Sequence, residues 1–286
     1  MFRIVGLALV SLVAGSALVA GSAAGGGGPS PGAVTGWDGV LSPGGTTRYV
    51  AMPAGRTTAV AAISVGTGRV ERYASVPGTF GIPLVAYDGS AAGVSADGRT
   101  LVLSSFAGAP GPGVVTRFAI LSTKRLKRER LLELRGSWSF DALSPDGRLL
   151  YAVEYLSGDG ARYRVRAIDL TSGRLLAGSI ADSKEARGEM RGSPMTRATS
   201  RDGGWAYTLY AKPDGTAFVH ALDTRHRKAV CIDLPWKRVQ QALWQVRMSV
   251  RDDRRALVLT QKNVGRLATI DTRGYKVRAF KRPVNP

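Results

Sequence analysis

The sequence is poor in the residues that build disulfide and zinc sites. Its 286 residues include one cysteine, Cys231, and two histidines, His220 and His226. A single cysteine cannot form an internal disulfide, and one cysteine with two histidines falls short of the four ligands of a structural zinc site. We therefore expect neither a disulfide scaffold nor a zinc finger, and we expect no bound metal and no cofactor.

Acidic residues are also scarce compared with basic ones. The chain has 40 Lys and Arg against 21 Asp and Glu, which gives a formal net charge of +19. With 44% hydrophobic residues it is globular rather than disordered, and it is long enough to bury a substantial core. A strongly basic chain indicates an acidic partner. The same charge would also keep a protein soluble without any ligand.

The first 24 residues have the pattern of a secretory signal peptide. Arg3 precedes an apolar run over residues 4–19, and the small residues Ser22, Ala23 and Ala24 stand where a signal peptidase reads. Residues 25–33, rich in Gly and Pro, predict a flexible leader before a folded domain over 34–286. We expect a secreted protein with no integral membrane span after cleavage. The alternative is a membrane anchor formed by the uncleaved segment, because about 20 apolar residues can just cross a bilayer.

A turn rich in Ser, Pro, Asp and Gly, followed by an alternating apolar segment, occurs five times, and the last two copies are degraded. The copies begin at residues 42, 95, 144, 200 and 250, so successive copies are 49 to 56 residues apart. The clearest copy runs from Ser144 to Arg148 and precedes the apolar segment 149–153. In such turns Asp bonds its own backbone and Gly accepts a positive φ, which closes a tight turn between strands. Period-two alternation, plain in residues 161–170, supports strands, and no long helical period is present.

Units of about 50 residues with four short strands are typical of propeller blades. The Ser144–Arg148 turn, and Ile168-Asp169 before Gly173-Arg174, resemble the blades of the WD-repeat-like and YVTN-type β-propeller superfamily. The resemblance spans residues 34–283 and implies an all-β propeller of about five four-stranded blades. It is incomplete, because no Trp-Asp dipeptide ends a blade and the superfamily commonly has seven units.

The same interpretation predicts how the ring closes. If each Ser/Asp/Gly turn leads from an outer strand into an inner strand, residues 33–41 are an outer strand without a blade of their own. The final unit has three strands and ends near residues 276–281. We therefore expect the N-terminal strand to pair there and to complete the last blade.

Motifs of several enzyme classes are missing. The sequence has no Gly-x-Ser-x-Gly elbow, and its glycine-rich loops lack the Lys and the following helix of a nucleotide site. A propeller hydrolase or lyase would instead need acidic residues that converge on the central channel. The candidates are Asp38, Asp141 and Glu154. For Glu154, which lies on a predicted inner strand, a salt bridge to an arginine of the neighbouring blade is the competing interpretation.

Arginines gather in the two kinds of turn that share one face of the predicted propeller. The candidate ligand-binding residues are Arg99, Arg125, Arg148, Arg174, Arg225 and Arg273. Turns at the other strand ends, such as 157–160, are nearly uncharged. Because Gly-Arg pairs also belong to the blade pattern, they need no ligand. We expect a non-enzymatic binding module whose partner is an anionic extracellular polymer, a membrane surface or a protein, and export argues against nucleic acid. The alternative is the channel-centred enzyme.

Overall fold

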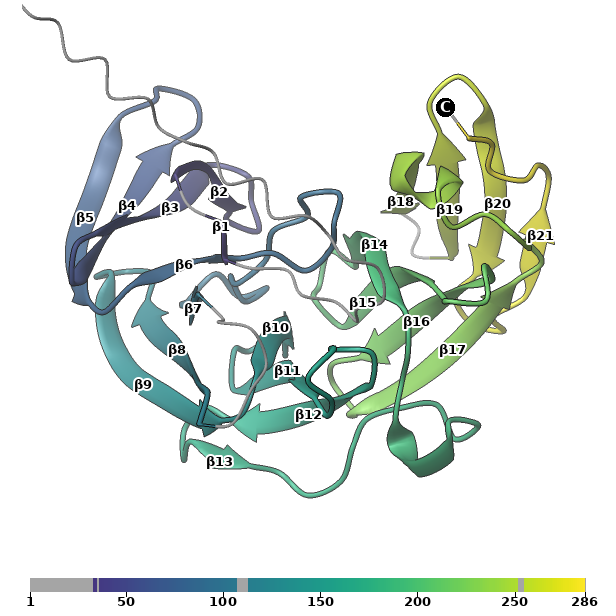
Figure 1. The fold of residues 1–286 in the computed structure, drawn as a ribbon. Helices are drawn as coiled ribbons and strands as arrows, with labels where there is room; N and C mark the ends of the chain where they lie inside the picture. The colour runs from purple at the N-terminus through teal and green to yellow at the C-terminus, as the bar shows by residue number, and fades with distance from the viewer. Residues whose placement is uncertain (1–32, 35, 107–112, 252–254, 286) are drawn as a thin grey trace, which may run out of the picture.

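The computed structural model describes residues 33–34, 36–106, 113–251 and 255–285, and these form an almost purely β structure (Figure 1). Five antiparallel sheets follow one another along the chain, and each is one blade. The predicted all-β fold of five four-stranded blades is confirmed. The predicted signal peptide, residues 1–24, and residues 25–32 of the predicted leader lie outside the described residues, whereas Ala33, the last residue of that leader, belongs to a short strand.

The blades have the following strands. Blade 1 contains β2 (Gly36–Leu41), β3 (Thr47–Ala54), β4 (Thr57–Ser64) and β5 (Val70–Pro77). Blade 2 contains β6 (Phe80–Pro83), β7 (Thr100–Ser105), β8 (Val115–Ser122) and β9 (Lys127–Arg135), and β1 (Ala33–Val34) pairs with β6. Blade 3 contains β10 (Trp138–Leu143), β11 (Leu149–Tyr155), β12 (Tyr163–Asp169) and β13 (Arg174–Leu175).

The remaining two blades complete the chain. Blade 4 contains β14 (Ser193–Thr199), β15 (Trp205–Ala211), β16 (Ala217–Asp223) and β17 (Lys228–Leu234). Blade 5 contains β18 (Val246–Val250), β19 (Ala256–Gln261), β20 (Gly265–Asp271) and β21 (Val277–Ala279). Helix is limited in the described part to two short 3₁₀ turns, η1 (Ala186–Gly188) and η2 (Ala242–Gln245), and neither has the length and apolar character needed to cross a membrane.

The predicted closure by the N-terminal strand is wrong. β2 pairs with β3 inside blade 1, and β1 pairs with β6 of blade 2, so neither strand joins β21. The reason is the place of the Ser/Asp/Gly turn, which connects the first strand of a blade to its second strand. The first strands lie near the centre and the fourth strands near the outside (Figure 1). Glu154 consequently lies on a second strand, β11, and not on an inner one.

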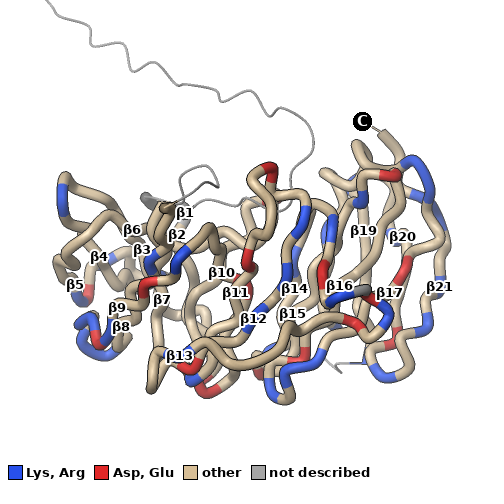
Figure 2. Tube along the Cα trace, turned by 60° about the horizontal axis from the view of Figure 1, so that its bottom comes forward, with Lys and Arg blue, Asp and Glu red and all other residues tan. Residues whose placement is uncertain are grey.

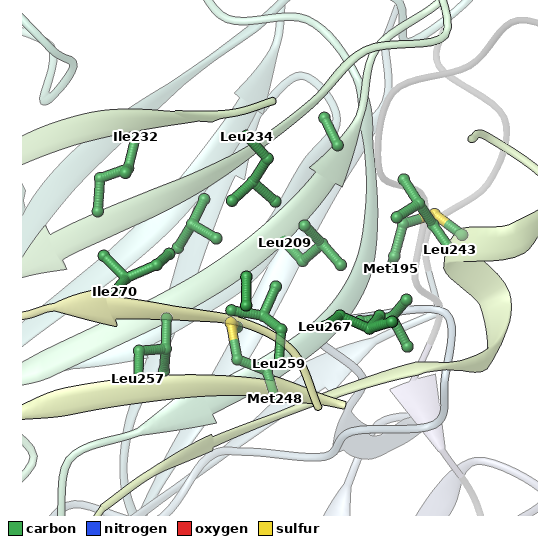
Figure 3. Close-up of a cluster of buried hydrophobic side chains, with 14 of the residues drawn as sticks. Met195, Leu209, Ile232, Leu234, Leu243, Met248, Leu257, Leu259, Leu267 and Ile270 are labelled. Carbon is green, nitrogen blue, oxygen red and sulfur yellow. The ribbon is translucent and has the colours of Figure 1, made fainter. Parts of the chain in front are cut away.

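The hydrophobic core consists of four clusters, each between two successive blades. Blades 1 and 2 share one cluster, blades 2 and 3 a second, blades 3 and 4 a third, and blades 4 and 5 a fourth. In the last of these, Leu209 and Leu234 of blade 4 pack against Leu259 and Ile270 of blade 5 (Figure 3). Within the described residues no such cluster joins blade 5 to blade 1. The sheets therefore follow an arc that ends in these two blades (Figure 1).

The connection between β6 and β7 extends from blade 2 toward blades 4 and 5. The backbone N–H groups of Tyr87 and Asp88 donate to the carbonyls of Pro194 and Met195 on β14, at 2.9 and 3.2 Å. The Tyr87 ring stacks on Trp244 of η2 with 5.4 Å between centroids. This connection therefore links strands that the chain order alone would leave apart.

Candidate functional site

The Ser/Asp/Gly turns share one hydrogen-bond network. In blade 3 the Ser144 hydroxyl donates to Asp146 Oδ1 at 2.6 Å and accepts from the Leu149 N–H at 2.9 Å. Ser95 with Asp97 and Ser200 with Asp202 form the same network in blades 2 and 4. These bonds fix the start of the second strand, because serine and aspartate satisfy the turn's backbone groups locally.

Each of these turns is bonded to the turn between the third and fourth strands of the same blade. The five equivalent backbone bonds run from Val65 to Thr46, Thr123 to Arg99, Leu170 to Arg148, Thr224 to Gly204 and Thr272 to Arg255, at 2.8 to 3.1 Å from N to O. Both kinds of turn therefore lie on one rim, as the alternation of strand direction predicts. We call these ten turns the turn rim, and the connections at the other strand ends the opposite rim.

The six candidate arginines all lie on the turn rim with exposed side chains. They are Arg99, Arg125, Arg148, Arg174, Arg225 and Arg273. Arg148 pairs with Asp146 at 3.7 Å and Arg225 with Asp202 at 3.1 Å. The other four make no ion pair with any described residue. The structure thus brings these arginines to one surface, and four of them keep their guanidinium groups available.

Basic residues also lie on the opposite rim, which carries more charge than we expected from its turn sequences. Arg56, Arg191 and Arg238 are exposed there, and Lys237 and Lys262 add to them. Figure 2 shows Lys and Arg along both edges of the trace. The positive field of this chain is therefore broad, and charge alone does not distinguish the two rims.

The three candidate catalytic acids are not brought together as free carboxylates. The side chain of Asp141, on β10, forms a buried ion pair with Arg197 of β14 in the neighbouring blade. Glu154 accepts from Arg164 at 2.6 Å and lies 3.3 Å from Arg166, both on the adjacent strand β12 of its own blade. Asp38 lies on β2, but its side chain is outside the described ones. Both described carboxylates are thus engaged by guanidinium groups.

A pocket of about 280 Å³, which we call the central pocket, lies among the inner strands of blades 1 to 4. Val40, Leu41 and Phe140 give it apolar walls, and Asp141 and Arg197 also line it. Asp141 is the one carboxylate among the described lining residues. General acid and base chemistry on a glycoside uses two carboxyl groups, so the described lining does not supply that pair.

The two histidines and the cysteine are placed as packing or turn residues. His220 is buried on β16, and burial lowers its pKa to about 4, so the ring is neutral at pH 7. Cys231 lies across from His220 with 3.9 Å between Sγ and Nδ1, and burial raises the pKa of its thiol to about 12. A thiol with so high a pKa is a poor nucleophile. His226 is exposed and its Nδ1 lies 2.8 Å from Asp223 on the turn rim.

No group of three His, Cys, Asp or Glu side chains is arranged to hold a metal ion in the ranges that the structure describes. Sequence reasoning missed a cluster of aromatic side chains between blades 4 and 5, formed by Trp205, Tyr207 and Tyr275. The alternation Trp205-x-Tyr207 after a Ser/Asp/Gly turn was the signal for the first two. Nothing local to Tyr275 indicates that it meets them.

The chain resembles several solved structures at low sequence identity. Neither a scan against family models nor a search of curated proteins finds a match. Among solved structures, the chain is similar to hydrazine synthase of Kuenenia stuttgartiensis, at 17% identity and a TM-score of 0.47, covering 88% of this chain and 80% of that one. It is also similar to the Cps50 (Swd1) β-propeller domain of Myceliophteria thermophila, at 11% identity and a TM-score of 0.49, covering 84% and 69%. A putative TolB from Agrobacterium tumefaciens matches at 15% identity and a TM-score of 0.46, covering 87% and 79%.

The chain is a five-bladed β-propeller. This assignment rests on its five successive antiparallel sheets, each with four blade strands and one with β1 added at its edge, and on the four clusters that join successive blades. A propeller supports unrelated activities, so function must be argued from particular surfaces.

Proposed function

We propose that this propeller is an exported, non-enzymatic binding module that holds an anionic extracellular polymer on its turn rim. The observation that supports this most directly is the set of exposed arginines Arg99, Arg125, Arg174 and Arg273, which make no ion pair with described residues. They lie on blades 2, 3 and 5, so an extended polymer can contact several blades together. Guanidinium groups of this kind bind carboxylate, sulfate and phosphate oxygens.

The turn geometry repeats the positive charge from blade to blade. In every blade the turn between the third and fourth strands contains one residue in the left-handed region, and a basic residue follows it. The left-handed residues are Gly68, Leu126, Gly173, Arg227 and Tyr275, and the basic residues are Arg69, Lys127, Arg174, Lys228 and Lys276. A regular row of charges suits a polymer with repeated anionic groups, which favours the turn rim over the less regular opposite rim.

The arrangement of the acids gives no comparable support to the alternative enzyme. Asp141 and Glu154 are both in ion pairs, on different strands, and the described lining of the central pocket contains one carboxylate. A hydrolase or lyase would have to release at least one of these carboxylates before it could transfer a proton. We therefore propose ligand binding on the turn rim and not catalysis in the central pocket.

The experiment compares two matched sets of charge reversals. Arg125→Glu, Arg174→Glu and Arg273→Glu remove three exposed arginines from the turn rim, and Arg56→Glu, Arg191→Glu and Arg238→Glu remove three from the opposite rim. Both triple variants change the net charge equally. We expect the turn-rim variant to bind polyglutamate and oligogalacturonate roughly tenfold more weakly or worse, because each exposed ion contact contributes up to about 1 kcal/mol. The opposite-rim variant should lose much less.

Added salt should weaken wild-type binding steeply, because the Debye length is only ~8 Å at physiological ionic strength. Circular dichroism and thermal melting of both variants check that the fold is kept. Equal losses from the two rims, or binding that salt does not affect, would contradict the proposal. The export part is checked separately, since N-terminal sequencing of secreted material should begin near Gly25 and intact Met1 in the membrane fraction would contradict it.

A further inference from the structure

A pocket of about 460 Å³ opens on the turn rim between blades 4 and 5. Trp205 and Tyr207 of β15 line it from blade 4, and Arg273 and Tyr275 of the turn after β20 line it from blade 5. Asp202 of the Ser/Asp/Gly turn lies at the same pocket. We call this site the aromatic pocket, and it is separate from the central pocket among the inner strands.

Three aromatic rings form two walls of the aromatic pocket. Trp205 and Tyr207 stack, with ring centroids 5.9 Å apart and planes 10° apart. Tyr275 meets Trp205 at 6.3 Å with an interplanar angle of 59°. Tyr207 is buried, whereas Trp205 and Tyr275 remain half-buried and present part of their rings to the pocket. Trp205 and Tyr207 form one wall together because residues two apart on a strand share a face. The backbone N–H of Trp205 also donates to the Ser200 hydroxyl at 2.9 Å, which fixes the start of the strand.

Tyr275 occupies a backbone conformation that disfavours a bulky side chain. Its φ is 55°, in the left-handed region where blades 1 and 3 have Gly68 and Gly173. Leu126 has the same conformation in blade 2, and burial in the core between blades 1 and 2 accounts for it. Tyr275 is less buried, and like the exposed Arg227 of blade 4 it lacks that compensation. A strained residue that places an aromatic ring at a surface pocket points to a role in binding.

The charges around the aromatic pocket favour an anionic ligand. The Asp202 carboxylate is engaged, since it lies 3.1 Å from Arg225 Nη2 and accepts from the Ser200 hydroxyl at 2.7 Å and the Gly204 N–H at 3.2 Å. Arg273 is exposed and makes no ion pair with the described part of the chain. An aromatic surface with a guanidinium beside it suits a ring that carries an acidic group.

We propose that the aromatic pocket binds an acidic pyranose unit of a polysaccharide, such as a uronic acid. The apolar face of the sugar ring would lie against Trp205 and Tyr275, and its carboxylate would meet Arg273. The tilt between the two rings suits a puckered ring better than a flat base, which stacks in a parallel slot. This inference rests on the proposed function of the turn rim, and it adds the chemical class of the repeating unit.

Isothermal titration with oligogalacturonate, polyglutamate and oligothymidylate tests the inference. Polyglutamate has carboxylates without sugar rings, and oligothymidylate has stacking bases without uronic acid. The variants are Trp205→Leu, Tyr275→Asn and Arg273→Gln, and Asn is chosen because it tolerates the left-handed conformation. Trp244→Leu and Arg238→Gln are the matched controls, because Trp244 is exposed in η2 and Arg238 is exposed on the opposite rim.

We expect Trp205→Leu and Tyr275→Asn each to weaken oligogalacturonate binding about threefold to tenfold, the usual contribution of an aromatic contact. They should leave polyglutamate binding unchanged, and the controls should change neither. Arg273→Gln should weaken both ligands about twofold to fivefold. If Trp205→Leu does not fold, Tyr275→Asn and Arg273→Gln still decide the result.

The failures of the two proposals can be told apart. If the turn-rim triple variant loses both carboxylate ligands but Trp205→Leu and Tyr275→Asn bind oligogalacturonate normally, the aromatic pocket is not the saccharide site and the rim function stands. If the triple variant binds both ligands normally, the rim function fails and this inference fails with it. Oligothymidylate binding that depends more on Trp205 and Tyr275 than oligogalacturonate binding does would overturn the saccharide assignment in favour of a nucleic acid.

Discussion

The buried ion pair between Asp141 and Arg197 joins blade 3 to blade 4, and we predict that Arg197→Met destabilises the propeller strongly. The exposed fractions of the two side chains are 4% and 6%. Arg197 Nη2 donates to Asp141 Oδ1, and Nη1 donates to the carbonyl oxygen of the same residue at 3.1 Å. The other carboxylate oxygen, Oδ2, is buried without a hydrogen-bond partner among the described residues. The carboxylate therefore depends on Arg197 alone.

The expected loss follows from the charge that the substitution leaves behind. Removing one partner of a buried pair costs about 3–5 kcal/mol, because the remaining charge has neither water nor a counter-ion. Replacing both partners by apolar residues is often neutral, since both desolvation costs disappear together. We therefore expect the free energy of unfolding to fall by about 3–5 kcal/mol in Arg197→Met. The Asp141→Leu/Arg197→Met double variant should recover most of that loss.

Urea denaturation followed by tryptophan fluorescence measures these free energies. Arg164→Met is the matched control, because Arg164 pairs with Glu154 at 2.6 Å in a partly exposed setting and should cost no more than about 1 kcal/mol. The coupling energy from the double-mutant cycle should be about 2 kcal/mol or more. If Arg197→Met and Arg164→Met cost the same, or if the coupling energy is near zero, the burial argument is refuted.

Two further predictions concern His220 and the left-handed turn residues. Burial lowers the pKa of His220 to about 4, against about 6.5 in the unfolded chain. Between these values only the unfolded state binds the proton, so the free energy of unfolding should decrease as pH falls from 6.5 to 4, by up to about 3 kcal/mol. His220→Gln should reduce the dependence of the free energy of unfolding on pH, measured by urea titrations at several pH values. The argument would be contradicted if the pH dependence stayed as in wild type, or if the control His226→Gln changed it equally. Gly68 and Arg227 both have positive φ, a conformation that costs about 1–2 kcal/mol for a residue with a Cβ. Gly68→Ala should therefore lower the free energy of unfolding by about 1 kcal/mol, although the added Cβ would meet nothing within 4 Å. Arg227→Gly should raise the free energy of unfolding by a similar amount. Shifts of the same sign in thermal melts of the two variants would show that the left-handed backbone is not the cause.

The repeat and the blade count could be predicted because the turn chemistry is local. Ser144, Asp146 and Gly147 form their network within one turn, so their order along the chain is enough to recognise it. The division of the strands among the blades could not be predicted in the same way. First and second strands both show apolar segments next to the turn, and only pairing of β2 with β3 decides that the turn lies inside the blade. This ambiguity produced the wrong closure and the wrong strand for Glu154.

The candidate site residues also differ in whether nearby sequence or a contact between blades sets their surroundings. Exposure of Arg125 and Arg273 follows from their turns and was predicted. The partner of Glu154 was within reach of the sequence, because Arg164 and Arg166 alternate on the next strand, where register places Arg164 opposite Glu154. The Asp141–Arg197 pair, in contrast, joins different blades across 56 positions of sequence, and no local pattern encodes such a contact.

Features that repeat in every blade and features found in one blade differ in what they say about function on the turn rim. A basic residue after the left-handed position occurs in all five blades, so the fold's own turn pattern accounts for it without a ligand. The left-handed position itself is more variable, with glycine in two blades and Leu126, Arg227 and Tyr275 in the other three. Tyr275 differs from Leu126 because it is not fully buried, and from Arg227 because it places an aromatic ring at a pocket. It lies against Trp205 beside Arg273. In the proposed function, the row of charges would supply long-range attraction for any polyanion, whereas the rings would supply a contact that depends on the ligand's shape. Specificity should therefore reside between blades 4 and 5, and affinity should be spread along the rim.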